Sequence, residues 1–145
     1  NSIQIKIEFQ KIAMRWEHSH CKSKEQINCV GYISTQGELF IPKEITPSDA
    51  ILARSKPNTN TIDQLYTDFQ YYQSTIDPMV IKTFSKTNID QLTLEPNVTV
   101  ILGYQKQKER LDRFLKAYSK LKKKNRKIKR ATFDMRYPKG FALSY

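Results

Sequence analysis

Two histidines and two cysteines lie close together near the start of the chain, as His18, His20, Cys21 and Cys29. Imidazole and thiolate groups are common zinc ligands, but this spacing matches no usual zinc motif. The adjacent His20 and Cys21 would also have to converge on one ion from a polar loop. We therefore expect no metal site. The two cysteines can form a disulfide or can remain as free thiols.

The sequence shows no recognisable catalytic machinery. Its carboxylates are scattered, and no arrangement of Ser, His and Asp, or of Cys and His, suggests an activated nucleophile. No glycine-rich loop of the kind that binds phosphates occurs. The sequence therefore predicts a binding protein without a cofactor rather than an enzyme.

The chain is strongly basic, with a formal net charge of +11 and a dense run of cations from Lys120 to Arg130. Such a run can bind nucleic acid or an anionic lipid surface. It can also be a solvated helix end, where cations suit the helix dipole. No zinc-finger spacing or RNP motif supports nucleic-acid readout. We expect a solvated helix end that acts mainly by steering partners, and we keep a nucleic-acid or anionic-surface binding domain as the alternative function.

The segment near the C-terminus has the composition of a protein-docking strand. A strand that ends the chain tends to lie at a sheet edge, where its unpaired N–H and C=O groups can accept a strand from another protein. Proline suits such an edge because it lacks an N–H, glycine allows close approach of a second backbone, and tyrosine is a common interface anchor. The alternative is an ordinary core strand with a bulge. The candidate docking residues are Arg136, Tyr137, Pro138, Lys139, Gly140, Phe141 and Ala142.

Side-chain alternation beyond Gly140 predicts which residues of this segment contact the core. Successive side chains of a strand point to opposite faces of its sheet. We expect Phe141, Leu143 and Tyr145 to face the core, and Ala142 to face the other way. The small side chain of Ala142 would leave room for a neighbouring strand or loop. Arg136 could form a forked contact with a carboxylate.

The first half of the chain predicts strands followed by a helix. Period-two patterns indicate strands over residues 3–9, 13–16, 29–33 and 38–41. Gly37 supplies a positive φ in the hairpin between the last two. A connection with three prolines follows over 42–60, interrupted by the apolar Ile51-Leu52-Ala53. Thr61 and Gln64 then fit a capping box at a helix start, and Asp77-Pro78 ends that helix.

The second half predicts more strands and a second helix. Apolar patterns indicate strands over 80–84, 91–94 and 98–102, with a turn at Glu95-Pro96-Asn97. A helix opens after Gly103, and one strand region over 128–145 is interrupted at Pro138-Lys139-Gly140. The order predicts an α+β fold: a mixed, mostly antiparallel sheet with two helices on one face. Because the chain begins inside a strand-like pattern, we expect it to be a piece of a longer protein.

Three segments resemble, in order, the bacterial cell-division protein family FtsQ (DivIB). Ile5-Lys6-Ile7-Glu8 with the following Arg15-Trp16 is similar to the end of the family's POTRA domain and its entry into the next domain. Gly31 to Pro42 is similar to a family hairpin. The strongest match comes last and covers Leu102-Gly103, Arg110-Leu111, Phe114 and Phe133 to Ala142.

This resemblance implies an extracytoplasmic piece of a single-pass protein of the bacterial inner membrane, anchored by a transmembrane helix outside this chain. Residues 1–10 would be the last strand of a truncated POTRA domain, and residues 11–145 the β-domain. The family has no catalytic activity, and its β-domain is implied to recruit FtsB- and FtsL-like proteins at the division septum. We expect edge-strand pairing at residues 136–142, no nucleic-acid partner and, in this oxidising compartment, a disulfide between Cys21 and Cys29.

Overall fold

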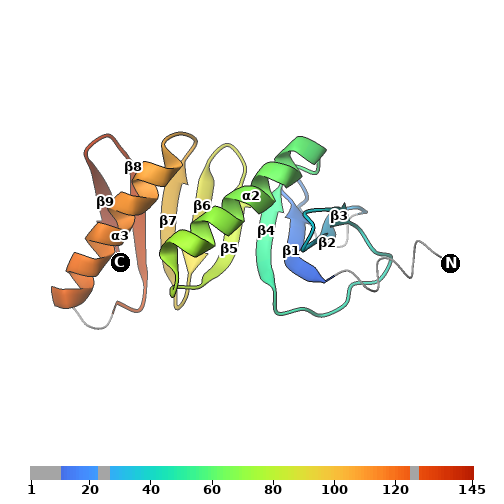
Figure 1. The fold of residues 1–145 in the computed structure, drawn as a ribbon, viewed down its shortest axis with the longest axis horizontal. Helices are drawn as coiled ribbons and strands as arrows, with labels where there is room; N and C mark the ends of the chain where they lie inside the picture. The colour runs from blue at the N-terminus through green and yellow to red at the C-terminus, as the bar shows by residue number, and fades with distance from the viewer. Residues whose placement is uncertain (1–10, 23–26, 125–127) are drawn as a thin grey trace. The chain divides into compact units, whose positions relative to one another are not determined.

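A computed structural model describes residues 11–22, 27–124 and 128–145 of the chain (Figure 1). The chain forms two compact units, one ending at Asp68 and the other running from Phe69 to Tyr145. The predicted strand over residues 3–9 lies outside the described residues. The boundary predicted between residues 10 and 11 therefore stays a prediction.

The first unit contains a four-stranded sheet in the order β3-β2-β1-β4. Its members are β1 (Ile12–His18), β2 (Val30–Ser34), β3 (Leu39–Phe40) and β4 (Ile51–Ser55). β2 pairs antiparallel with both β1 and β3, whereas β4 pairs parallel with β1. Gly37 has a φ of 83°, as predicted for the β2–β3 hairpin.

The prediction of an irregular connection over residues 42–60 is wrong at β4. Met14 of β1 lies opposite Ile51, and the indole N–H of Trp16 donates a 3.1 Å hydrogen bond to the Ser55 hydroxyl. Trp16 and Ala53 are fully buried. β4 is therefore stabilised by a partner far away in the sequence, which its short apolar stretch between prolines does not reveal.

Helix α2 (Thr59–Ile76) begins earlier than predicted. The Asn58 side chain accepts a 2.8 Å hydrogen bond from the backbone N–H of Thr61, so Asn58 is the N-cap. The predicted capping box at Thr61 and Gln64 is wrong, because Thr61 already lies in the first turn. The helix ends at Ile76, directly before Asp77-Pro78, as predicted.

The second unit contains a five-stranded sheet in the order β5-β6-β7-β8-β9. Its strands are β5 (Ile81–Lys86), β6 (Asp90–Leu94), β7 (Val98–Gly103), β8 (Ala131–Tyr137) and β9 (Gly140–Ser144). β5, β6 and β7 form an antiparallel meander. Helix α3 (Gln107–Lys124) then returns the chain to the parallel strand β8, and β9 is antiparallel to β8.

The two faces of this sheet differ in chemistry. Residues directly opposite one another across the strands share a face. One such row is apolar and consists of Phe84, Leu92, Val100, Phe133 and Leu143. The adjacent row, on the other face, consists of hydroxyl side chains: Thr83, Thr93, Thr99, Thr132 and Ser144. Each strand thus has an apolar side for packing and a polar side.

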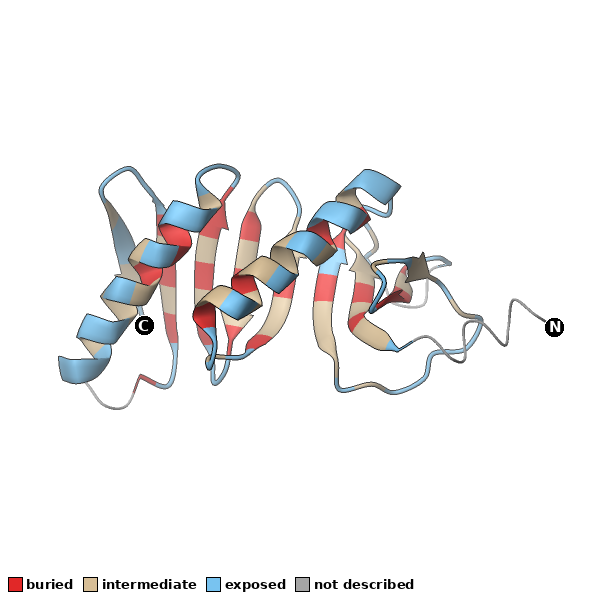
Figure 2. Cartoon of the chain, viewed as in Figure 1, coloured by how far each residue is buried: buried red, intermediate tan, exposed pale blue. Residues whose placement is uncertain are grey.

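Both helices pack on the apolar face of the second sheet. The ring of Tyr72, in the part of α2 that belongs to this unit, lies 5.4 Å from Phe84 between centroids. The ring of Phe114 on α3 lies 5.0 Å from that of Phe133. Figure 2 shows the resulting buried bands along the strands and the inner sides of the helices. The predicted α+β fold is confirmed, with a mixed, mostly antiparallel arrangement of strands.

No helix in the described part of the chain is long and apolar enough to cross a membrane.

Candidate functional site

The predicted C-terminal strand region is in fact a hairpin of two strands. Residues 138 and 139 form the turn between β8 and β9. β9 is the last strand in the sheet order, and in the described part of the chain it pairs with β8 alone. The sheet edge is therefore β9, whereas Arg136 and Tyr137 end the adjacent strand β8.

A bulge lies in β8 just before this turn. Asp134 is opposite Ala142 and Tyr137 is opposite Gly140, so two residues of β8 face Phe141 alone. Bulges of this kind occur often at sheet edges and increase the local twist. The sequence analysis offered a core strand with a bulge as the alternative to a docking strand. That alternative describes β8, whereas β9 is the strand at the sheet edge.

Arg113 of α3 holds the turn of the hairpin in place. One nitrogen of its guanidinium, Nη1, donates hydrogen bonds of 2.7 Å to the Tyr137 carbonyl and 3.1 Å to the Gly140 carbonyl. The other, Nη2, donates one of 3.4 Å to the Pro138 carbonyl. This role of Arg113 cannot be predicted from the sequence, because an arginine on a helix surface gives no local sign of which backbone it contacts.

Arg110, one turn earlier on α3, joins the helix to the end of β7. It is buried, and its Nη1 donates a 2.7 Å hydrogen bond to the Leu102 carbonyl. A Cβ atom on Gly103, whose φ is 85°, would lie 2.5 Å from this nitrogen. The Leu102-Gly103 and Arg110-Leu111 motifs therefore meet at one structural junction, which requires glycine for both its backbone conformation and its lack of a side chain.

Asp134 and Arg136 form a forked ion pair on the polar face of the sheet. Nε and Nη2 of Arg136 donate hydrogen bonds of 2.9 and 2.7 Å to the two carboxylate oxygens of Asp134. These bonds lower the pKa of Asp134, against a smaller opposing effect of burial, and they raise the pKa of Arg136. The fork that we expected Arg136 to offer to a carboxylate is occupied by Asp134.

The predicted docking residues are largely accessible. Tyr137 is 49% exposed and Phe141 is 41% exposed. Pro138, Lys139 and Ala142 are also exposed, and a Cβ atom added to Gly140 would meet nothing within 4 Å.

We predicted that Phe141 and Tyr145 face the core. Both residues are more exposed than that prediction implies. The ring of Phe141 does face the helix side, 5.8 Å from that of Phe133, and Leu143 lies opposite Phe133. However, α3 packs on β7 and β8. The helix covers β9 only in part, and Phe141 is partly exposed while Tyr145 is 72% exposed.

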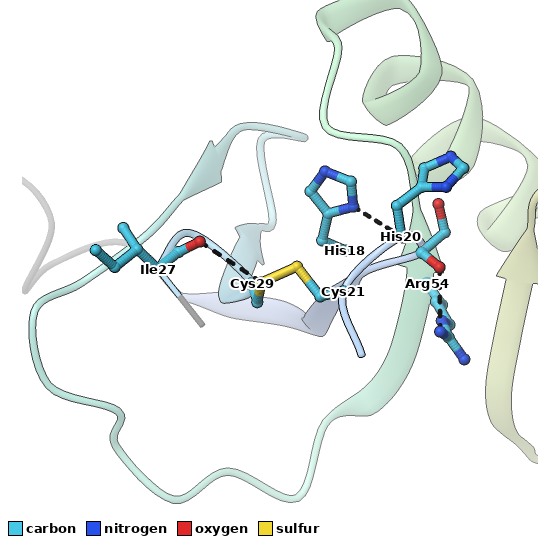
Figure 3. The surroundings of a disulfide bond; sticks show 7 residues. His18, His20, Cys21, Ile27, Cys29 and Arg54 are labelled. Atoms are coloured by element: carbon cyan, nitrogen blue, oxygen red, sulfur yellow. Dashed lines mark hydrogen bonds between the residues drawn. A yellow bond between two sulfur atoms is a disulfide. The ribbon is translucent and has the colours of Figure 1, made fainter. Parts of the chain in front are cut away.

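In the first unit, the sulfur atoms of Cys21 and Cys29 are joined in a disulfide with a Cα–Cα distance of 5.9 Å (Figure 3). The backbone N–H of His20 donates a 3.0 Å hydrogen bond to Nδ1 of His18. The described residues contain no cluster of three or more His, Cys, Asp or Glu side chains that could hold a metal ion. The disulfide joins the chain just after β1 to the residue that precedes β2.

Comparison with known proteins agrees with the resemblance seen in the sequence. Residues 24–136 match the family model described as cell division protein FtsQ/DivIB, C-terminal. A search of curated proteins found no match for the chain. The matched region contains β2 to β7, both helices and β8 up to Arg136, and it includes Gly103, Arg110 and Arg113. This chain belongs to the FtsQ/DivIB C-terminal family and has a role in cell division.

Proposed function

We propose that this domain is a non-catalytic assembly module of the division machinery, and that it recruits FtsB- and FtsL-like proteins by strand addition to β9. The observation that carries the proposal is the position of β9 at the end of the sheet order. Its outer backbone groups can form a ladder with an incoming strand. The exposed Tyr137 and Phe141 lie beside that edge as apolar anchors.

The geometry of the hairpin favours this mode of binding. Folding has already ordered the turn, because Arg113 donates to three of its carbonyl groups. A preorganised edge loses less conformational entropy on binding than a flexible one. We propose that this domain lies on the periplasmic side of the inner membrane, where an FtsB-like partner would meet it at the septum.

The experiment compares two substitutions at one position of β9. Ala142→Pro removes a backbone N–H, whereas Ala142→Thr keeps it and suits a strand. Binding of the soluble extracytoplasmic domain of the FtsB-like protein from the same genome is measured by calorimetry. We expect Ala142→Pro to abolish binding and Ala142→Thr to retain it, with native circular dichroism for both. Unchanged binding by a folded Ala142→Pro variant would refute strand addition at β9.

A second candidate function, binding to an anionic surface or nucleic acid, is favoured by the net charge of +11. A salt titration separates it from strand addition. Affinity for nucleic acid falls steeply as salt rises because bound counterions are released. The backbone ladder at a strand edge depends on salt only modestly, because its hydrogen bonds join neutral groups, so strand addition should keep part of its affinity at high salt.

A further inference from the structure

A groove with a volume of about 420 Å³ runs between α3 and the β8–β9 hairpin. Its apolar lining comes from Ala117 and Leu121 of the helix and from Phe141 and Leu143 of β9. The groove exists because α3 packs on β7 and β8. β9 is the next strand outward, about 4.8 Å from β8, and is only partly covered by the helix.

Cations line the same groove from both walls. Lys116, Lys120 and Lys124 stand at intervals of four residues along α3, and Lys139 comes from the hairpin turn. Residues four apart lie on one side of a helix, spaced by about 6 Å along its axis. Within the described residues, none of these four ammonium groups is placed in an ion pair. The groove therefore combines an apolar floor with positive charge that can pair with a partner.

The lysine row changes the interpretation of the basic run. The sequence analysis treated the cations from Lys120 onward as one solvated helix end. The structure divides them, because Lys120 and Lys124 line the groove whereas Lys122 and Lys123 do not. Lys122 instead lies over the Tyr118 ring, with Nζ 5.9 Å from its centroid.

From this arrangement we infer that the segment added to β9 is an acidic amphipathic strand, and that the α3–β9 groove selects it. The inference rests on the proposed function, since it names the chemistry of the partner at that same edge. Side chains on one side of a strand repeat every 6.6–6.8 Å or so, close to the spacing of the lysines. An incoming strand would place apolar side chains beside Phe141 and Leu143, and carboxylates within reach of Lys116 and Lys120.

The partner's apolar side chains would cover the apolar surface of β9 that α3 leaves exposed. The ring of Phe141 lies 5.8 Å from that of Phe133, yet Phe141 as a whole is 41% exposed. Closing the groove would remove water from around the lysines, which strengthens charge pairing. The groove is selective because a basic segment at the same edge would bring like charges together, which disfavours binding.

The test compares two double charge reversals on the same helix. In the groove variant, Lys116→Glu is combined with Lys120→Glu. In the control, Lys122→Glu is combined with Lys123→Glu, which changes the net charge equally outside the groove. Both are made in the full chain and assayed against the FtsB-like extracytoplasmic domain at 150 mM salt. We expect the groove variant to bind at least about 30-fold more weakly and the control to lose less than about threefold.

Each outcome is informative when Ala142→Pro is measured beside them. If Ala142→Pro abolishes binding but the two double variants lose affinity equally, the groove inference is wrong and strand addition stands. If Ala142→Pro has no effect, the proposed function fails and the inference with it. If the native chain binds phosphatidylglycerol vesicles or a DNA oligonucleotide more tightly than the FtsB-like domain, and the groove variant loses that binding, the lysines form an anionic-surface site and the inference is overturned.

Discussion

The Nη1 nitrogen of Arg113 lies 2.7 Å from the backbone carbonyl oxygen of Tyr137, 24 residues later in the chain. This hydrogen bond, with those to Gly140 and Pro138, fastens the β8–β9 hairpin to α3. Most residues of the predicted docking segment are exposed, so few apolar contacts hold it. The hydrogen bonds from Arg113 therefore do much to hold the β8–β9 hairpin, our proposed docking site, in one conformation.

We predict that Arg113→Lys and Arg113→Ala fold but loosen the hairpin. A lysine ammonium cannot reproduce the planar fork of guanidinium donors, so the conservative change does not rescue the contact. Hydrogen exchange of the amides over residues 140–144 should accelerate, while those of β6 and β7 stay protected. Binding of the FtsB-like domain should weaken about tenfold. Loss of hydrogen bonds from a charged group costs about 1.5 kcal/mol, which corresponds to a tenfold change in the dissociation constant.

The control for this pair is Lys123→Ala, which removes one positive charge from an exposed position of the same helix. It should leave both hydrogen exchange and binding unchanged. Native-like exchange of β9 amides in Arg113→Ala would show that the turn is ordered without Arg113.

Tyr137→Ala should weaken partner binding by about 2 kcal/mol or more, because truncating an aromatic anchor at an interface commonly costs that much. The melting temperature should hardly change, since the side chain is 49% exposed in the unbound chain. Calorimetry with the FtsB-like domain and a thermal scan of the free chain measure the two effects. A variant that binds as tightly as the native chain would place the anchor elsewhere.

Local sequence patterns predict much of this fold because they depend on contacts between near neighbours. The β2–β3 turn at Gly37, the end of α2 before Asp77-Pro78 and the meander of β5 to β7 all follow from turn chemistry and periodicity. β4 was missed because it is stabilised by pairing with β1. The N-cap was misplaced because Asn58 and Thr61 are both good capping residues, and only the geometry distinguishes them.

The candidate site shows the same division between local and distant contacts. Turn residues predicted the interruption at Pro138-Lys139-Gly140, but not that it is the turn of a hairpin whose second strand, β9, forms the sheet edge. The burial of Phe141 depends on how far α3 extends over the sheet, and the role of Arg113 depends on a carbonyl 24 residues away. Neither relationship leaves a periodic pattern in the sequence.

The disulfide between Cys21 and Cys29 should stabilise the first unit by about 2–3 kcal/mol, chiefly by restricting the unfolded chain over a short loop. Replacing both cysteines with serine should lower the melting temperature and leave binding at β9 unchanged. Mass spectrometry without reductant should find the native chain two mass units lighter than its reduced form, because a disulfide lacks the two thiol hydrogens. Two thiols that react with an alkylating agent in the native chain would contradict the pairing.

The Asp134–Arg136 fork should make stability depend on pH in the acid range. The bonds from Arg136 place the pKa of Asp134 lower in the folded chain than in the unfolded chain. The unfolded chain therefore takes up the proton first as pH falls. The stabilisation is complete above the unfolded value of about 3.9, and it is lost as pH falls through the lower, folded value.

Asp134→Asn tests this dependence, because an amide cannot titrate and accepts weaker hydrogen bonds from the guanidinium. The free energy of unfolding, measured in urea between pH 5 and pH 2, should fall less steeply in the variant than in the native chain. The two curves should approach one another toward the acid end, as Asp134 of the native chain takes up its proton. Asp63→Asn, at an exposed position of α2, provides the control and should reproduce the native slope. Identical slopes for the native chain and Asp134→Asn would show that the ion pair contributes nothing to folding.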